Sequence, residues 1–261
     1  MSGKDGRARQ IVSLVPSLTE QVASWGLGER LVGRTRYCVQ PAWVVDRIPE
    51  VGGTKNPDMA RLLALQPDLV LLECSENSRE TAVALESAHV PFLALNIHSV
   101  DACIRASREM AWSLGCEAQG EATAQRIKAR LADRPLPALP AVVLLWRNPW
   151  ILAGEGTYLA DLLRCSGFQA LGPHGYARLS DEALADLDPA HVFLPDDPYP
   201  FKATDAADLR RLLPRARFHA PDGRALAWVL SRTADGLRVL KDLRISLAPP
   251  GVPHDPHHPA S

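Results

Sequence analysis

Aromatic side chains in this sequence gather where a bound molecule could stack on them. Only 6% of the 261 residues are Phe, Trp or Tyr, yet several of these fall at predicted strand ends or in loops. Their flat apolar rings suit a bulky ligand. We expect about half of them to face a cleft and the others to pack in the core. The residues concerned are Tyr37, Trp146, Trp150, Tyr176, Tyr199, Phe201 and Trp228.

Groups that could catalyse a reaction are few. The chain has no Gly-x-Ser-x-Gly, no Walker loop and no His-Glu-x-x-His segment. The Gly-Glu-Gly at 154–156 lacks the third glycine of a dinucleotide-binding turn. The isolated histidines are more often structural than ligands. Stacking rings without a catalytic set favour a binding protein over an enzyme. The histidines are His98, His174, His191 and His219.

A long loop, residues 33–58, carries more functional side chains than a connection requires. It combines Tyr37 and Trp43 with a Gly-Gly pair at 52–53 and with Lys55. Loops of this kind usually bind a ligand or partner. The alternative, given equal weight, is structural: Trp43 packs on the domain and the glycines supply turn dihedrals.

The stretch IVSLVPSLTE, residues 11–20, predicts a buried strand that runs directly into a helix. Ser17 and Glu20 have the spacing of a capping box, so we expect the helix to begin at Leu18. In open α/β sheets, ligands bind at the carboxyl edge of the strands, where this corner lies. A cap that binds no ligand is the alternative.

Composition excludes two classes of partner. The 29 basic and 30 acidic residues give a net charge of -1, which argues against nucleic acid. No apolar run approaches the roughly 20 residues of a membrane span, so no membrane insertion is expected.

The five cysteines form no Cys-x-x-Cys and cannot all pair, which argues against a zinc ribbon and a disulfide framework. The Pro- and His-rich tail, 249–261, is predicted to be disordered, with adventitious metal affinity as a second reading.

Two segments of the chain can be aligned with each other. RLLALQPDLVLL (61–72) and EALADLDPAHVFL (182–194) share a helix end, a Pro and a buried strand at matching positions. Their flanks also alternate strands with helices, which predicts parallel sheets with crossover helices. The fold class is therefore α/β, with two duplicated lobes at 9–116 and 139–248. Residues 117–138 predict a bridging helix and linker, a stiff strut that allows little movement between the lobes.

Taken in order, these segments resemble the class III substrate-binding proteins of ABC importers, the cobalamin- and ferric-siderophore-binding kind also called helical backbone metal receptors. The quoted matches are IVSLVPSLTE, VGRTRYC, IPEVGGTKNPD, LLALQPDLVLL, LPDDPYPF and WVLSRTADGL. The resemblance implies two Rossmann-like lobes joined by one long helix, a cobalamin-like corrinoid or iron chelate held between them, and no intrinsic cofactor. The implied ligand-binding residues are Pro16, Ser17, Tyr37, Gly53, Thr54, Lys55, Trp146, Trp150, Tyr176 and Trp228.

The acidic segments ENSRE (76–80) and DDPYPF (196–201) occupy equivalent places after the repeated strands. They are either solvated loops or a symmetric pair of contacts for a basic partner. The resemblance implies docking to an ABC permease through Glu76 or Glu80 and through Asp196 or Asp197; we expect Glu80 and Asp197. A docking role requires both to be exposed at the lobe tips, on the cleft-opening side.

Two features depart from secreted members of that family. The N-terminal segment MSGKDGRARQ lacks the apolar run of a secretory signal. Cys165 matches a cysteine that pairs in the cobalamin-binding relatives with one in the C-terminal helix, and this chain has none there. We therefore expect the chain in the cytoplasm, or in the periplasm if the start is mis-assigned or the chain is trimmed. We also expect it to be a monomer. The alternatives are a cytosolic enzyme or chaperone for a corrinoid or tetrapyrrole, and a metal-ion receptor.

Overall fold

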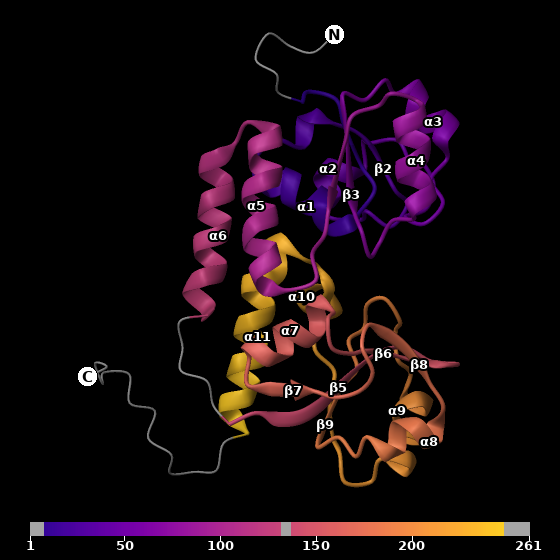
Figure 1. The fold of residues 1–261 in the computed structure, drawn as a ribbon, viewed down its shortest axis with the longest axis vertical. Helices are drawn as coiled ribbons and strands as arrows, with labels where there is room; N and C mark the ends of the chain where they lie inside the picture. The colour runs from indigo at the N-terminus through magenta and orange to yellow at the C-terminus, as the bar shows by residue number, and fades with distance from the viewer. Residues whose placement is uncertain (1–7, 132–136, 248–261) are drawn as a thin grey trace, which may run out of the picture.

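Two α/β lobes make up the computed structural model, which describes residues 8–131 and 137–247. The N-lobe holds the first sheet and the C-lobe holds the second, and the two lie end to end along the long axis of the molecule (Figure 1). This architecture confirms the predicted fold class. Within the described ranges, none of the helices combines the length and the apolar character needed to cross a bilayer.

The N-lobe is built on a four-stranded, fully parallel sheet in the order β2-β1-β3-β4. Its two central strands are fully buried runs, IVS and LVLLE, as expected for a sheet covered on both faces, whereas the two edge strands are only partly buried. The strands are β1 (Ile11–Ser13), β2 (Leu31–Arg34), β3 (Leu69–Glu73) and β4 (Phe92–Leu95). The helices are α1 (Pro16–Ser24), the 3-10 turn η1 (Gly28–Arg30), α2 (Ala42–Val45), α3 (Met59–Ala64) and α4 (Arg79–Ser87).

The C-lobe sheet is mixed, in the order β10-β9-β5-β6-β8, with β7 also paired to β5. The parallel pattern predicted for this lobe is incomplete, because a tight turn at Asn148 (φ +61) returns the chain as the antiparallel strand β6. The strands are β5 (Leu139–Trp146), β6 (Trp150–Ala153), β7 (Phe168–Ala170), β8 (Tyr176–Leu179), β9 (His191–Phe193) and β10 (Arg217–His219). The helices are α7 (Tyr158–Cys165), α8 (Asp181–Asp186), α9 (Ala203–Leu212), α10 (Gly223–Ala227), the 3-10 turn η2 (Leu230–Arg232) and α11 (Thr233–Ser246).

The duplicated segments form the same unit in both lobes. The first copy is α3 followed by β3, and the second is α8 followed by β9. Each copy turns through a residue with positive φ directly before the shared proline, Gln66 at +49 and Asp188 at +41. This conformation is uncommon for non-glycine residues, so its recurrence extends the repeat from sequence to backbone geometry.

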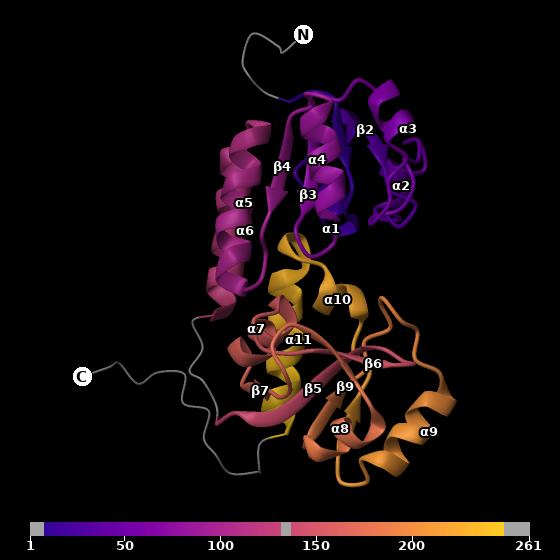
Figure 2. The same ribbon diagram turned by 45° about the vertical axis from the view of Figure 1, so that its right-hand side comes forward.

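A helical hairpin leads from the N-lobe to the C-lobe. Helices α5 (Val100–Leu114) and α6 (Glu117–Leu131) lie side by side along the N-lobe, and α6 also packs on α11 (Figures 1 and 2). The predicted bridge at 117–138 therefore contains α6. The rest of that predicted linker at 132–136 and the predicted disordered tail at 249–261 lie outside the described residues.

The largest group of buried apolar side chains runs through both lobes. It includes Ile11 and Leu71 of the first sheet together with Val143 and Phe193 of the second. Smaller clusters complete the far side of each lobe. Because relative rotation of the lobes would expose part of this shared core, the helical strut is not the only element that resists such movement.

Candidate functional site between the lobes

A buried carboxylate organises the N-lobe wall at the carboxyl end of β3. Glu73 is 2% exposed. Its Oε2 accepts hydrogen bonds from the Ser75 amide (2.8 Å), the Ser75 hydroxyl (2.5 Å) and the Glu76 amide (3.0 Å). Its Oε1 accepts from the Ile97 amide at 3.2 Å. These bonds tie the loop after β3 to the loop after β4, so the wall is held by backbone donors.

The glycine turn at 53–55 joins this wall through Asn77 and Lys55. The Asn77 amide nitrogen donates to the carbonyls of Leu14 (3.3 Å) and Thr54 (2.9 Å), and Lys55 Nζ donates to the Ser75 carbonyl at 2.6 Å. A methyl group added at Gly53 would meet Asn56 Oδ1 at 2.6 Å, and the Tyr37 ring lies 3.7 Å from the same point. The structure thus brings Tyr37, Gly53, Thr54 and Lys55 together. Glu73 and Asn77 were not among the residues predicted from the sequence; the signal was a Glu at the end of a buried strand with an Asn in the loop that follows.

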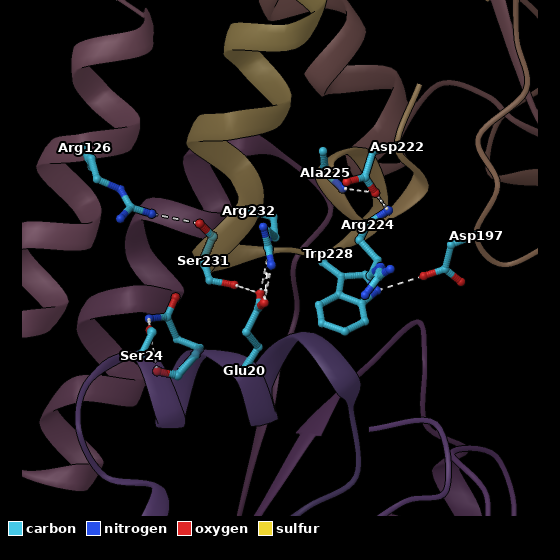
Figure 3. Close-up of polar contacts among 11 residues, drawn as sticks. Glu20, Ser24, Arg126, Asp197, Asp222, Arg224, Ala225, Trp228, Ser231 and Arg232 are labelled. Atoms are coloured by element: carbon cyan, nitrogen blue, oxygen red, sulfur yellow. Dashed lines mark hydrogen bonds and ion pairs between the residues drawn. The ribbon is translucent and has the colours of Figure 1, made fainter. Parts of the chain in front are cut away.

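The C-lobe wall is held by side chains. Trp228 is 7% exposed, and its Nε1 donates to Asp197 Oδ2 at 2.9 Å (Figure 3). The Arg224 guanidinium lies 6.0 Å from the centre of the Trp228 ring. Asp222 caps the short helix α10 by accepting from the Arg224 amide at 2.9 Å, which positions Arg224 beside the ring.

Tyr176 of the C-lobe reaches the N-lobe wall. Half of its side chain is exposed, but its hydroxyl end lies close to the loop after β3. Withdrawal of this hydroxyl from water, together with the carboxylates of Glu73 and Glu76, raises the pKa of Tyr176 to about 12, against an opposing hydrogen bond with Ser75. Tyr176 is therefore a neutral hydrogen-bonding group at neutral pH.

Two carboxylates from opposite lobes influence each other at the same place. Loss of solvent and the neighbouring Glu73 raise the pKa of Glu76, with Lys55 opposing and Asp197 adding to the rise. Burial also raises the pKa of Asp197, and its hydrogen bond from Trp228 opposes the shift. Carboxylates from the two lobes therefore lie near each other, an arrangement that favours a ligand which donates hydrogen bonds over an anionic one.

The two remaining tryptophans of the predicted site differ in position. Trp146 is partly exposed, and its ring centre lies 5.0 Å from that of Tyr199, which in turn lies 4.9 Å from Phe201. Trp150 is only 5% exposed. Its Nε1 donates to Asp181 Oδ1 at 2.7 Å, and the Arg147 guanidinium covers its ring at 5.0 Å. Trp150 therefore packs in the core of the C-lobe, and it also lines a second pocket together with Arg147 and Asp181.

The capping box predicted for Ser17 and Glu20 is wrong. Helix α1 begins at Pro16, with Val15 as its N-cap and no side-chain cap. Ser17 is buried and Pro16 half-buried. The Glu20 carboxylate instead crosses to the C-lobe, where it accepts from the Ser231 hydroxyl at 2.7 Å and from Arg232 Nε at 2.9 Å (Figure 3). A charged pair with good geometry outweighs a local cap here, because an unpaired buried carboxylate is costly.

We call this contact of Glu20 with Ser231 and Arg232 the interlobe clasp. The Arg126 guanidinium of α6 donates to the Ser231 carbonyl at 2.8 Å and so adds to it. Elsewhere at the junction, Asp161 Oδ2 of α7 accepts from the Val100 amide at the start of α5, at 2.8 Å. Together with the shared core, these bonds fix how the lobes meet.

The predicted docking acids occupy different environments. Glu80 is exposed in the first turn of α4. Asp197 is half-buried and bonded to Trp228, while Asp196 is exposed and accepts from the Gly223 amide at 2.6 Å. Glu80 and Glu76 are both exposed, and neither carboxylate has a hydrogen bond or ion pair in the described part of the chain, whereas Asp196 and Asp197 are bonded within the C-lobe. Cys165 forms no disulfide bond in the described part of the chain. No group of His, Cys, Asp or Glu within 8–131 and 137–247 is arranged to hold a metal ion.

Comparison with known families matches this two-lobed arrangement. The model of the periplasmic binding protein family covers residues 11–211, which is more than half of the chain. The chain belongs to the periplasmic binding protein family. This confirms the family resemblance, and it agrees with the prediction of a binding protein, because the family consists of substrate-binding proteins and not of enzymes.

Individual relatives are more distant. An uncharacterized ABC transporter substrate-binding lipoprotein of Bacillus subtilis (strain 168) is 27% identical over 202 residues, 72% of this chain and 64% of the relative. The vitamin B12-binding protein of Vibrio campbellii is 32% identical over 87 residues, 33% of this chain and 31% of that protein. The chain thus spans less than two thirds of the length of these curated relatives.

Solved structures share the fold. The periplasmic vitamin B12 binding protein of Vibrio cholerae has a TM-score of 0.77 at 18% identity and covers 92% of this chain and 98% of its own. A periplasmic heme binding protein from Pseudomonas aeruginosa also has a TM-score of 0.77, at 24% identity, covering 93% of this chain and 94% of its own. At these identities the likeness shows the fold alone.

Proposed function

We propose that this chain is the substrate-binding component of an ABC importer and that it holds a cobalamin-like corrinoid between its lobes. Family membership and the names of the relatives support the importer role. The observation that carries the ligand class is the pair of facing acids, Glu76 and Asp197, beside the rings of Tyr37, Tyr176 and Trp228. A corrinoid carries amide side chains that donate to such acceptors, whereas haem and many ferric chelates carry carboxylates that these acids repel.

Binding is tested by separating protein from free chromophore. Purified chain is incubated with cyanocobalamin, haemin or a ferric trihydroxamate and passed through a desalting column, and the visible spectrum of the protein fraction is recorded. We expect cobalamin to co-elute at one molecule per chain. Co-elution of haemin or the ferric chelate in its place contradicts the ligand class. Chemical change of the recovered ligand supports the alternative of a corrinoid-handling enzyme or chaperone.

The contribution of the interlobe face is tested with matched variants. Tyr176→Ala removes a ring that reaches across to Ser75, whereas Trp112→Ala removes an exposed ring on α5, away from both walls. We expect cobalamin affinity to fall in the first variant and to stay unchanged in the second. Equal affinities in the two variants contradict the placement of the ligand.

The importer role also implies a location and a docking contact. The relatives are named as periplasmic proteins or as a lipoprotein, which supports a position outside the cytoplasm for this chain as well. Fractionation of cells that express the native gene tests this, and recovery in the cytosol contradicts it. For docking, Glu80→Arg is expected to reduce uptake of labelled cobalamin by those cells, whereas Glu86→Arg, the same change at the exposed far end of α4, is expected to leave it unchanged.

A further inference from the structure

A second space between the lobes lies beside the interlobe clasp, on the side away from Trp228. Figure 3 shows Glu20 and Arg232 in the centre, with Trp228 and Asp197 to one side and Ser24 and Arg126 to the other. The space on the Arg126 side is a groove of about 560 Å³ bounded by α1, α6, η2, the start of α11 and the N-terminal end of α2. None of the ten residues predicted to bind the main ligand lines it.

Gln21 forms part of the groove wall and has an unused acceptor. The residue is 1% exposed. Its Nε2 donates to Ser24 Oγ at 2.8 Å, but its Oε1 is buried and has no hydrogen-bond partner. A buried amide oxygen without a donor is costly, because the hydrogen bonds that it made with water in the unfolded chain are not replaced. A group that donates an N–H or O–H from the groove offsets this cost.

The charged residues of the groove leave one group of each sign available. Glu20 and Arg232 satisfy each other in the clasp. Asp235 makes no hydrogen bond or ion pair with the described part of the chain, although its charge contributes to the raised pKa of Arg232. Arg126 donates one hydrogen bond, to the Ser231 carbonyl, and its remaining N–H groups have no partner among those residues.

The rim of the groove supplies an apolar surface. Trp43 is 71% exposed and lines the groove together with Pro41. An indole this exposed offers a face to an aliphatic chain or to a cation. The volume of the groove lies within the usual range for small-molecule sites. A site with one free anion, one free cation and an unpaired acceptor fits an amphoteric molecule better than a simple ion.

We propose that this groove binds a small zwitterion of amino-acid chemistry. The ammonium group donates to Gln21 Oε1 and Asp235, the carboxylate accepts from Arg126, and the aliphatic part packs on Trp43. Because the groove touches α1 and α6 as well as α11, such a ligand spans the junction of the lobes. The site is separate from the proposed corrinoid site and does not depend on it.

Three matched probes test the proposal. L-leucine carries both charges, isopentylamine retains only the ammonium group, and 4-methylpentanoate retains only the carboxylate. Binding to the full chain is measured by saturation-transfer NMR and calorimetry at millimolar concentration. We expect saturable binding of L-leucine and at least tenfold weaker binding of the other two. No saturable binding of L-leucine, or equal binding of all three, overturns the proposal.

Variants place the probe in the groove. Arg126→Met keeps the aliphatic stem and removes the charge, and is expected to weaken L-leucine binding about tenfold, the value of a charge-assisted hydrogen bond. Gln21→Leu removes the unused acceptor and is also expected to weaken it. Arg130→Met makes the same change one turn along α6, outside the groove, and is expected to have no effect. Cobalamin binding measured on each variant separates this proposal from the proposed function. Unchanged L-leucine affinity in Arg126→Met overturns it.

Discussion

The two walls of the interlobe site are held in place by different means. In the N-lobe the loops are fixed by backbone amides and carbonyls around Glu73 and Asn77. In the C-lobe the wall depends on side-chain contacts, chiefly that between Trp228 and Asp197. The difference indicates that changes in the N-lobe wall act mainly on folding, whereas changes in the C-lobe wall act mainly on the ligand.

The largest expected effect is on stability, from Glu73→Ala in the N-lobe. The substitution leaves several donors without their acceptor, and we expect a loss of roughly 3–4 kcal/mol in the free energy of unfolding, measured in urea. Glu86→Ala, at an exposed acid of the same lobe, is expected to change it by less than about 0.5 kcal/mol. A loss below about 1 kcal/mol for Glu73→Ala contradicts the account of the N-lobe wall.

The second-largest expected effect is a loss of stability at acid pH, caused by two histidines of the C-lobe. His191 and His219 on neighbouring strands stack with ring nitrogens 2.9 Å apart, against Phe168 and Phe193. Burial first, and then the charges of His219, Arg217 and Arg244, lower the pKa of His191 to about 4. The pKa of His219 is lowered too, by burial and Arg217.

Because the pKa of His191 is lower in the folded state, the unfolded chain takes up a proton first as the pH falls. The stabilising contribution of neutral His191 is therefore complete above the unfolded pKa of 6.5 and is lost as the pH falls toward 4. We expect a loss of roughly 2–3 kcal/mol across this window. Hydrogen exchange at these pH values should show β9 and β10 losing protection before β1 and β3. His191→Phe should flatten the dependence. An unchanged profile in that variant, or earlier loss in the N-lobe, contradicts the assignment.

A smaller effect is expected on ligand affinity from Trp228→Phe. Phe keeps an aromatic ring at this position, but Asp197 loses its Nε1 donor. Cobalamin affinity should therefore fall about tenfold, and stability by no more than the roughly 1–3 kcal/mol of one lost hydrogen bond. Bound chromophore should also quench tryptophan emission in the unmodified chain, and less so in this variant. Trp112→Phe is the matched control. Equal quenching in both variants contradicts a position of Trp228 beside the ligand.

The smallest effect is expected in the overall shape. The shared core and the interlobe clasp add to the helical strut, so the radius of gyration should change little on binding cobalamin. Small-angle scattering with and without ligand measures this. A decrease as large as that of a hinge-closing receptor contradicts the inference that both lobes move as one body.

Much of the fold could be predicted from the sequence because its signals are local. The repeated helix-Pro-strand segments at 61–72 and 182–194 carry the periodicity of α3-β3 and α8-β9. The mixed character of the C-lobe sheet could not be read in the same way, since it depends on a turn of a few residues at Asn148. The same limit applies to Trp150, whose burial depends on Asp181 and Arg147.

The sequence by itself determined the α/β class, the duplication, and the long loop that brings Tyr37 to Gly53, because periodicity and residue type act over short distances. Only the tertiary structure decided the partner of Glu20. The Glu20 carboxylate does not cap its own helix but binds Ser231 and Arg232, more than 200 positions away in the sequence. This contact is more favourable than a local cap because the Arg232 guanidinium neutralises a buried carboxylate. The same long-range contact lies between Trp228 on one side and the groove lined by Gln21 and Arg126 on the other, an arrangement that local sequence patterns do not encode.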